Sequence, residues 1–213
     1  MITAVLFDLH GVVTSSPWAA LAEAGAGGDH SQDRVLEVML GDYAADSDHP
    51  WHRLERGEIS LPEYGGAVLA LAAEEGVPLD FGRLRGFNDR IAVHESVVDR
   101  IRSLRAAGLR TALVTNNVKE LAAGWRELVP ADELFNVVVD SSAVGVRKPN
   151  PEIFRIALRE LGVASPDEAV FLDDAPGNVA GARAAGLHAI EVPEGGVEQA
   201  LAELDALLAA TTD

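Results

Sequence analysis

The segment that most constrains the fold is a short apolar run that ends in one carboxylate and then in a glycine. It reads Val5-Leu6-Phe7-Asp8-Leu9-His10-Gly11. A run of β-branched and large apolar residues that closes on a polar side chain predicts a buried parallel strand. The carboxyl end of such a strand is where an α/β sheet holds its ligands. Asp8 is therefore the first candidate functional residue, with the capping of a tight turn as the alternative.

From about residue 95 onward, the sequence alternates between helical and strand patterns. The predicted strands lie at residues 109–115, 135–139, 169–173 and 187–192. Asn150-Pro151 and Pro176-Gly177 open two of the helices between them, and an amphipathic helix is expected at 197–208. Such alternation is typical of a parallel sheet with helices on both faces. We predict a Rossmann-like α/β fold.

Residues 14–94 carry helical signals only, so we predict a helical cap inserted after the first strand. Ser16-Pro17 and the capping-box pattern Ser60-Leu61-Pro62-Glu63 each open a helix. The glycine-rich stretch 25–28 lacks the preceding strand that a nucleotide-binding loop requires, and we predict a loop between helices there. The predicted domains are a core at 1–13 and 95–213 and a cap at 14–94.

The charge of the chain limits its partners. Its 17 basic and 34 acidic residues give a formal net charge of -17, which disfavours nucleic acid and anionic membranes. The absence of cysteine excludes thiolate catalysis and thiolate metal sites. No basic segment followed by a long apolar one opens the sequence, so we expect a cytoplasmic protein, monomeric or homodimeric. An anionic substrate would need a metal or local cations at its site.

Four polar points follow the predicted strands or lie in the loops beyond them. They are Asp8, Thr115-Asn116, Lys148 and Asp173-Asp174. Because the carboxyl ends of parallel strands share one edge of the sheet, these points can converge. Singly they have plainer explanations, since Thr115-Asn116 could cap a helix and Lys148 could be a solvated loop residue. Two adjacent carboxylates after a buried strand repel each other, which favours a bound cation.

In this order, the motifs resemble the four motifs of the haloacid dehalogenase (HAD) superfamily. They are Asp8-Leu9-His10-Gly11-Val12-Val13, Leu113-Val114-Thr115-Asn116, Arg147-Lys148-Pro149 and Phe171-Leu172-Asp173-Asp174 with Asn178. The insert resembles the superfamily's small cap, and residues 54–60 resemble a cap segment of its phosphatase-like members. The run at residues 144–154 is most similar to the phosphatase domain at the amino end of soluble epoxide hydrolases.

The resemblance implies a Mg²⁺-dependent hydrolase of a small phosphorylated metabolite. Asp8 would attack phosphorus and form an aspartyl-phosphate that water then cleaves. The Asp8 carboxylate and the backbone carbonyl of His10 would bind Mg²⁺. Asp174 would be a direct ligand and Asp173 would act mainly through water.

The resemblance also implies how the phosphoryl group is held. Thr115 would donate to a phosphoryl oxygen, helped by the backbone N–H groups of Leu9 and Asn116. Lys148 would offset the negative charge of the site, and Asn178 would orient these groups from behind.

The sequence departs from the superfamily's phosphatase pattern at His10, where an aspartate usually protonates the leaving oxygen and later activates water. A histidine titrates near neutrality, so His10 could replace that acid/base. Alternatively, only its backbone carbonyl matters, or its ring becomes a metal ligand that favours Mn²⁺, Co²⁺ or Ni²⁺.

Two other functions stay open. One is a metal-independent 2-haloacid dehalogenase, against which the Asp173-Asp174 pair argues, because such enzymes generally carry neutral residues there. The other is a metal- or phosphate-binding protein that has lost turnover through His10.

The cap contains weaker signals. His49 and His52 are spaced to share a helix face, but two ligands do not complete a typical metal site, and we expect a solvated surface there. Trp18 and Trp51 also fall in the cap, where one of them could line a substrate pocket.

Overall fold

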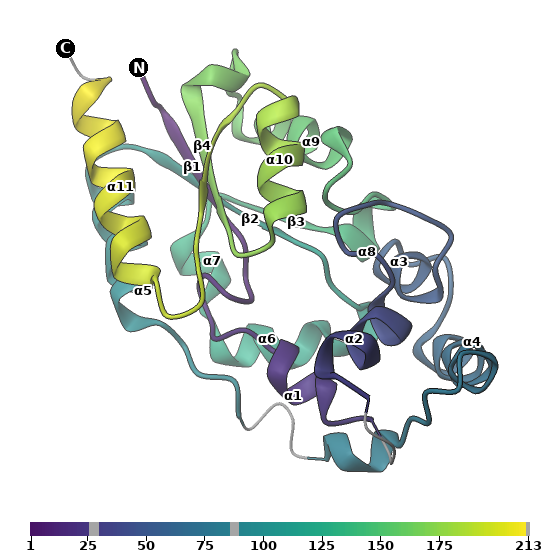
Figure 1. The fold of residues 1–213 in the computed structure, drawn as a ribbon. Coiled ribbons are helices and arrows are strands. Elements are labelled where there is room, and N and C mark those ends of the chain that lie inside the picture. The colour runs from purple at the N-terminus through teal and green to yellow at the C-terminus, as the bar shows by residue number, and fades with distance from the viewer. Residues whose placement is uncertain (26–29, 86–89, 212–213) are drawn as a thin grey trace.

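A computed structural model describes residues 1–25, 30–85 and 90–211 of the chain. Its centre is a five-stranded parallel sheet with the strand order β3-β2-β1-β4-β5 (Figure 1). The strands are β1 (Ala4–Phe7), β2 (Arg110–Thr115), β3 (Val137–Asp140), β4 (Ala169–Asp173) and β5 (His188–Glu191). The predicted α/β fold is confirmed. Strand β3 begins two residues later than predicted because Phe135 is the C-cap of the preceding short helix.

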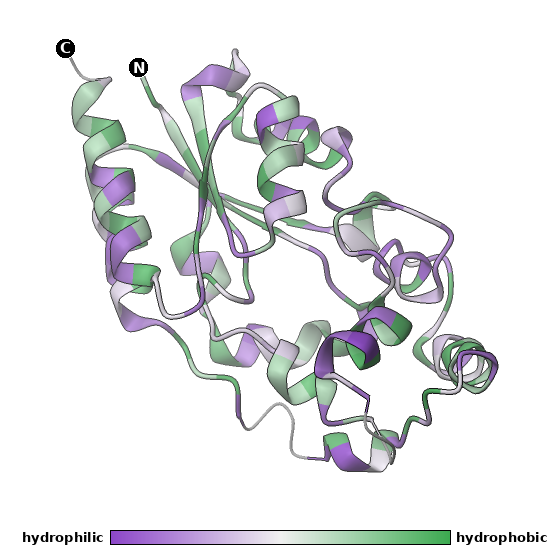
Figure 2. Ribbon diagram, viewed as in Figure 1, coloured by the Kyte–Doolittle hydropathy of each residue, from purple (hydrophilic) through white to green (hydrophobic). Residues whose placement is uncertain are grey.

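Helices cover both faces of the sheet, as predicted. On one face lie α5 (Glu95–Ala106) and α11 (Val197–Ala210), and on the other lie α9 (Pro151–Leu161) and α10 (Pro176–Ala184) (Figure 1). Because neighbouring strand residues point to opposite faces, Phe7 packs in the apolar cluster of α5 and α11, whereas Leu6 packs in that of α9. Figure 2 shows how apolar the central strands are, as burial on both faces requires.

Short segments complete this part of the chain. They are η3 (Lys119–Leu121), α6 (Ala122–Leu128), α7 (Ala131–Leu134), α8 (Ser141–Val144) and η4 (Pro166–Glu168). Among the described residues, no helix combines the length and the apolarity needed to cross a bilayer.

The segment between β1 and α5 is helical and gathers beyond the carboxyl edge of the sheet (Figure 1). Its helices are α1 (Trp18–Ala22), α2 (Gln32–Leu40), α3 (Pro50–Glu55), α4 (Leu61–Glu74) and η1 (Phe81–Leu84). Both bonds of the predicted capping box are present at the start of α4, between Ser60 and Glu63. Of the predicted loop at 25–28, residues 26–28 lie outside the described part of the chain.

Two adjacent crossings join this insert to the core. The N–H of Ser15 donates to the carbonyl of Ala92 at 2.8 Å, and the N–H of His94 donates to the carbonyl of Val13 at 2.9 Å. The outgoing and returning segments therefore lie side by side, next to the end of β1.

His52 differs from the sequence expectation. Instead of facing solvent, its side chain is fully buried, and Nδ1 accepts a hydrogen bond from the N–H of Ser47 at 3.1 Å. The prediction of a solvated surface is wrong at this residue because α3 packs against α8 of the core rather than lying free. Burial, followed by the charge of Arg147, lowers the pKa of His52 to about 3.

Candidate active site

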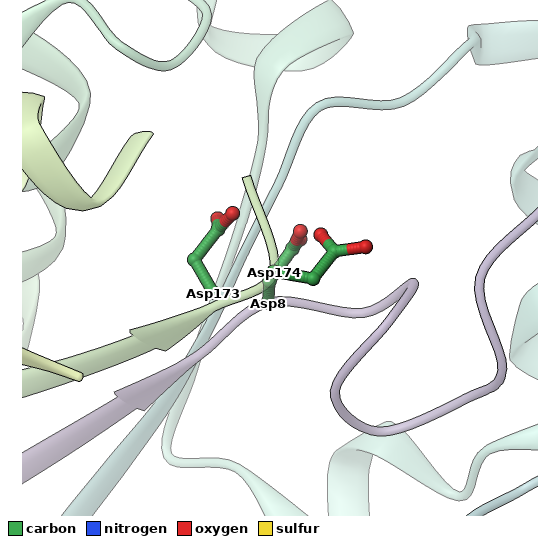
Figure 3. Close-up of side chains that lie close together, drawn as sticks. All are labelled: Asp8, Asp173 and Asp174. Carbon is green, nitrogen blue, oxygen red and sulfur yellow. The ribbon is translucent and has the colours of Figure 1, made fainter. Parts of the chain in front are cut away.

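Three carboxylates converge at the carboxyl edge of the sheet, as Figure 3 shows. Asp8 follows β1, Asp173 ends β4 and Asp174 is the next residue. The register explains the meeting: Phe7 pairs with Leu172 in the parallel ladder, so the residue after each of them lies beside its counterpart. One ligand atom from each of the three aspartates lies within 4.8 Å of the others.

Lys148 lies among these carboxylates. Its Nζ is 2.6 Å from Asp8 Oδ1 and 2.7 Å from Asp173 Oδ2, and its side chain is fully buried. Burial by itself would lower the pKa of Lys148, but the charges of Asp173 and Asp8 outweigh it and raise that pKa. Burial raises the pKa of Asp8, and burial followed by the charge of Asp173 raises the pKa of Asp174 to about 7. One ammonium thus faces three crowded carboxyl groups.

Asn116 holds the backbone of Lys148 in place. Its Oδ1 accepts from the N–H of Lys148 at 2.7 Å, and its Nδ2 donates to the carbonyl of Lys148 at 3.0 Å. The sequence predicted a role for the backbone N–H of Asn116 toward phosphate. The two-point contact made by its side chain was not foreseen.

Asp173 and Asp174 have different surroundings. Asp173 is fully buried, and its oxygens accept from Asn178 Nδ2 at 3.1 Å and from the N–H of Ala175 at 2.8 Å. Asp174, in contrast, lines a cleft. Asn178 therefore contacts the carboxylate that faces the protein interior, while Asp174 faces the open side.

Gly11 allows the turn after β1 to approach Asp174. It has a φ of +82°, and a Cβ built on it would lie 2.1 Å from Asp174 Oδ2. A side chain here would need both a left-handed backbone and a displaced carboxylate. The turn and the Asp174 carboxylate are therefore packed directly together.

Two predicted phosphate donors have other partners in this structure. The N–H of Leu9 donates to Asp8 Oδ1 at 2.7 Å. Thr115 lies buried at the end of β2, where its Oγ1 makes a long hydrogen bond of 3.4 Å to the carbonyl of Asn116.

The ring of His10 is held within its own turn. Its Nδ1 lies 2.9 Å from Thr14 Oγ1, and Thr14 Oγ1 donates in turn to the carbonyl of Leu9 at 3.3 Å. Burial, followed by the charge of Lys148, lowers the pKa of His10 to about 4. The ring is accordingly neutral at pH 7.

A buried ion pair that the sequence did not predict joins the insert to the core. Arg147 Nε donates to Glu55 Oε2 at 2.7 Å, Arg147 also donates to the carbonyl of Ala45, and Tyr43 donates to Glu55 Oε1 at 3.1 Å. Both charged side chains are almost completely inaccessible to solvent. The sequence did mark both residues, since Arg147 and Glu55 fall inside two of the segments that resemble family motifs. Nothing in the sequence around either residue indicates that they pair.

A cleft of about 1260 Å³ opens beside the carboxylates, between the insert and the core. It is lined by Gly11 and Asp174 on the core side and by Trp18 and Tyr43 on the insert side. Trp51 instead packs against the ring of Tyr64, with centroids 5.3 Å apart. Of the two tryptophans proposed for a pocket, Trp18 lines the cleft.

The donor set fits a hard divalent cation. Three carboxylates from two neighbouring strand ends offer oxygen ligands at close range, and Mg²⁺ prefers oxygen ligands. Burial, followed by the charge of Asp173, raises the pKa of Asp174, and a bound cation would favour its charged form again.

The sequence as a whole agrees with this geometry. The family model of haloacid dehalogenase-like hydrolases matches residues 2–186. The chain belongs to this family. Acyl-CoA dehydrogenase family member 10 of Mus musculus is 34% identical over 96% of the chain, and the match covers 19% of that relative. The chain spans about half or less of the first curated relatives it matches.

Two further relatives of this hydrolase span most of the chain. Glyceraldehyde 3-phosphate phosphatase of Methanopyrus kandleri is 32% identical over 92% of the chain and 85% of the relative. Bifunctional epoxide hydrolase 2 of Mus musculus is 27% identical over 87% of the chain and 35% of its own length, in keeping with the epoxide hydrolase resemblance.

Solved structures of the family share the fold. A predicted HAD-like hydrolase from Porphyromonas gingivalis superposes with a TM-score of 0.65 at 26% identity, covering 97% of this chain and 98% of that one. A HAD enzyme from Bacteroides thetaiotaomicron, solved in complex with magnesium and inorganic phosphate, has a TM-score of 0.62 at 18% identity over 92% and 96%. The second likeness is one of fold.

Proposed function

We propose that this HAD-like hydrolase is a Mg²⁺-dependent phosphatase of a small phosphorylated metabolite, with Asp8 as the nucleophile. The observation that carries the proposal is the meeting of Asp8, Asp173 and Asp174 around Lys148. A nucleophilic carboxylate needs positive charge beside it, here from Lys148 and from a cation held by the aspartates. A phosphomonoester is itself anionic and would otherwise be repelled.

The proposed reaction has two steps. An oxygen of Asp8 forms a bond to phosphorus while the bond from phosphorus to the substrate alcohol breaks, and the leaving oxygen takes a proton from water in the cleft, which the attacking water of the second step gives back. Water then attacks phosphorus, which releases phosphate and restores the Asp8 carboxylate. Mg²⁺, held by Asp8 and Asp174 with Asp173 behind them, would supply positive charge to the phosphoryl oxygens. Lys148 would balance Asp8 at every stage.

We also propose that residues 14–94 act as the cap. The cleft runs between this insert and the core, with Trp18 and Tyr43 on the cap side. The leaving alcohol would occupy the cleft, while Thr115 and the N–H of Asn116 would contact the phosphoryl group after Asp8 is engaged.

The decisive experiment measures Mg²⁺-dependent hydrolysis of p-nitrophenyl phosphate by the native chain and by Asp8→Asn. The native chain should hydrolyse it, chelation should stop it, and Asp8→Asn should lose it while still folding, because Lys148 keeps Asp173 as its partner. Asp132→Asn, an exposed change of the same chemistry, should keep full activity. Metal-independent chloride release from 2-chloropropionate would instead support the dehalogenase alternative.

One observation favours a second candidate, a metal- and phosphate-binding protein with little turnover. Thr14 engages Nδ1 of the His10 ring at 2.9 Å, and burial lowers the pKa of the ring to about 4, so a neutral ring has no extra proton to give to a leaving alcohol at pH 7. In that case the native chain should bind beryllofluoride in an Asp8-dependent manner without hydrolysing any phosphoester of a broad panel. His10→Asp, which restores the usual family residue, should then gain turnover.

A further inference from the structure

Among the described residues, the cleft beside Asp174 contains carboxylates but no lysine or arginine, and the histidine that lines it, His94, donates from Nδ1 to the carbonyl of Val12 at 2.7 Å. The carboxylates that line it are Asp33, Glu37, Asp42, Asp174, Glu194 and Glu198. No lysine or arginine lines it in the part of the chain that the structure describes, and residues 26–29, 86–89 and 212–213 contain neither type. The acidic side chains come from both walls: from the α2 region of the cap, and from the segment after β5 together with the first turn of α11.

The basic side chains nearest the catalytic carboxylates already form ion pairs. Lys148 lies between Asp8 and Asp173, and Arg147 is paired with Glu55 at 2.7 Å. Both basic side chains are fully buried beneath the cleft rather than exposed in it. They can offset the charge of the phosphoryl group and of the carboxylates around it, but neither lies in the cleft, where a second anionic group of the substrate would bind.

The wall on the cap side adds aromatic surface. Trp18 and Tyr43 line the cleft with their rings edge to face, 5.0 Å between centroids and 67° between planes. Aromatic faces attract ammonium groups and accept alkyl chains. The Arg147 guanidinium already lies over the Tyr43 ring, 5.0 Å from its centroid, so Trp18 is the ring that an ammonium would meet. Leu36 and Leu40 extend the same wall with apolar surface.

We infer that the substrate is a phosphomonoester whose leaving alcohol carries no anionic group, with amine-bearing alcohols preferred over neutral ones. This inference rests on the proposed function, because it concerns the leaving group of the same reaction. A carboxylate or a second phosphate on the alcohol would enter a cleft lined mostly by like charge, where the nearby Arg34 is already paired with Glu37 at 2.6 Å, whereas an ammonium would find both carboxylates and an aromatic ring.

Three phosphate esters test the effect of charge on the leaving alcohol directly. They are 2-aminoethyl phosphate, 2-hydroxyethyl phosphate and 2-phosphoglycolate, whose leaving groups all have two carbons. Each is measured as a substrate with Mg²⁺ and as an inhibitor of p-nitrophenyl phosphate hydrolysis, so that poor substrates are ranked too. We expect the amine to be best and the carboxylate worst, with about tenfold or more between them at low salt and a smaller gap at high salt.

A charge reversal in the cleft gives the matched test. Glu194→Lys should shift the preference, expressed as the ratio of the two specificity constants, away from 2-aminoethyl phosphate and toward 2-phosphoglycolate. Glu160→Lys, an exposed change on α9 outside the cleft, should leave that ratio unchanged. The inference is overturned if 2-phosphoglycolate ranks first for the native chain, or if both variants change the ratio equally. If the native chain shows no Asp8-dependent hydrolysis of p-nitrophenyl phosphate, the proposed function is refuted. Failure of the proposed function can therefore be distinguished from failure of the inference about the leaving alcohol.

Discussion

The Nζ of Lys148 lies 2.6 Å from Asp8 Oδ1, in a position with no access to solvent. The same nitrogen is 2.7 Å from Asp173 Oδ2, so one ammonium serves two carboxylates that neighbouring strands bring together. Because a buried charge without a partner is costly, these groups depend on one another for stability as well as for the proposed chemistry.

Lys148→Met tests that dependence. Removing one partner of a buried ion pair costs about 3–5 kcal/mol, so we expect the free energy of unfolding to fall by that order. Without the ammonium, the three carboxylates should have a higher affinity for a divalent cation. Mg²⁺ should therefore raise the melting temperature more in the variant than in the native chain. Thermal unfolding with and without Mg²⁺ measures both effects.

Lys119→Met is the control, since Lys119 is exposed and is the only other lysine of the chain. It should change neither the melting temperature nor the response to Mg²⁺. Equal stability of Lys148→Met and the native chain would show that the buried ammonium does not stabilise the carboxylates.

The ion pair of Arg147 and Glu55 should behave in the same way where the helical insert meets the rest of the chain. Arg147→Met leaves the Glu55 carboxylate buried without its cation, and we expect a loss of about 3–5 kcal/mol in urea unfolding. Adding Glu55→Gln removes the orphaned charge, so the double variant should be more stable than Arg147→Met alone. Arg102→Met, which breaks an exposed pair with Asp99, should cost less than about 1 kcal/mol.

Gly11→Ala separates backbone strain from the displacement of a proposed ligand. At a φ of +82°, alanine should cost about 1–2 kcal/mol in stability, and its Cβ would also collide with Asp174 Oδ2. We therefore expect a weaker affinity for Mg²⁺, measured by calorimetric titration. Gly108→Ala has a similar φ of +87° with open space around the added carbon, so it should cost only the backbone strain and keep the native Mg²⁺ affinity.

His52 should make the fold sensitive to acid. Its pKa is about 3 in the folded chain, lowered first by burial and then by Arg147, His49 and Arg56, against 6.5 for an ordinary histidine. At this group the unfolded chain thus binds more protons between these values, so the contribution of His52 to stability is retained above pH 6.5 and declines as the pH falls toward 3, by up to about 1.4 kcal/mol per pH unit. The N–H of Ser47 already donates to Nδ1, which leaves that nitrogen no room for a proton.

His52→Asn keeps an acceptor for the N–H of Ser47 but cannot be protonated. We expect its unfolding free energy to decline less steeply than that of the native chain over the same pH range. His188→Asn, at an exposed histidine, should reproduce the native profile. Parallel profiles for His52→Asn and the native chain would rule out this source of acid sensitivity.

Much of the site was predictable because it depends on strand register. Asp8 and Asp173 each end an apolar run, and parallel strands bring such ends to one edge. The register of Phe7 with Leu172 then makes them neighbours. The interpretation of the Lys148 motif likewise needed only its resemblance to the family pattern.

The orientation of individual side chains was not predictable in this way. His10 could be assigned as an acid/base or as a backbone ligand from its position, but the contact of its ring with Thr14 depends on how the turn closes. His52 has a polar, helical context in the sequence, yet its helix packs against the core. Neither outcome follows from the spacing of residues.

The sequence by itself determined the order of strands and helices, the insert after the first strand and the set of carboxylates at the sheet edge. Apolar runs, capping residues and glycines act on their near neighbours, so they can be interpreted locally. Only the tertiary structure decided that Arg147 pairs with Glu55 and that the cleft, in the part of the chain described, is lined by carboxylates without a lysine or arginine. Those features join residues far apart in the chain. Their energies arise from the burial of charged groups and the short distances between them, which exist only once the chain has folded.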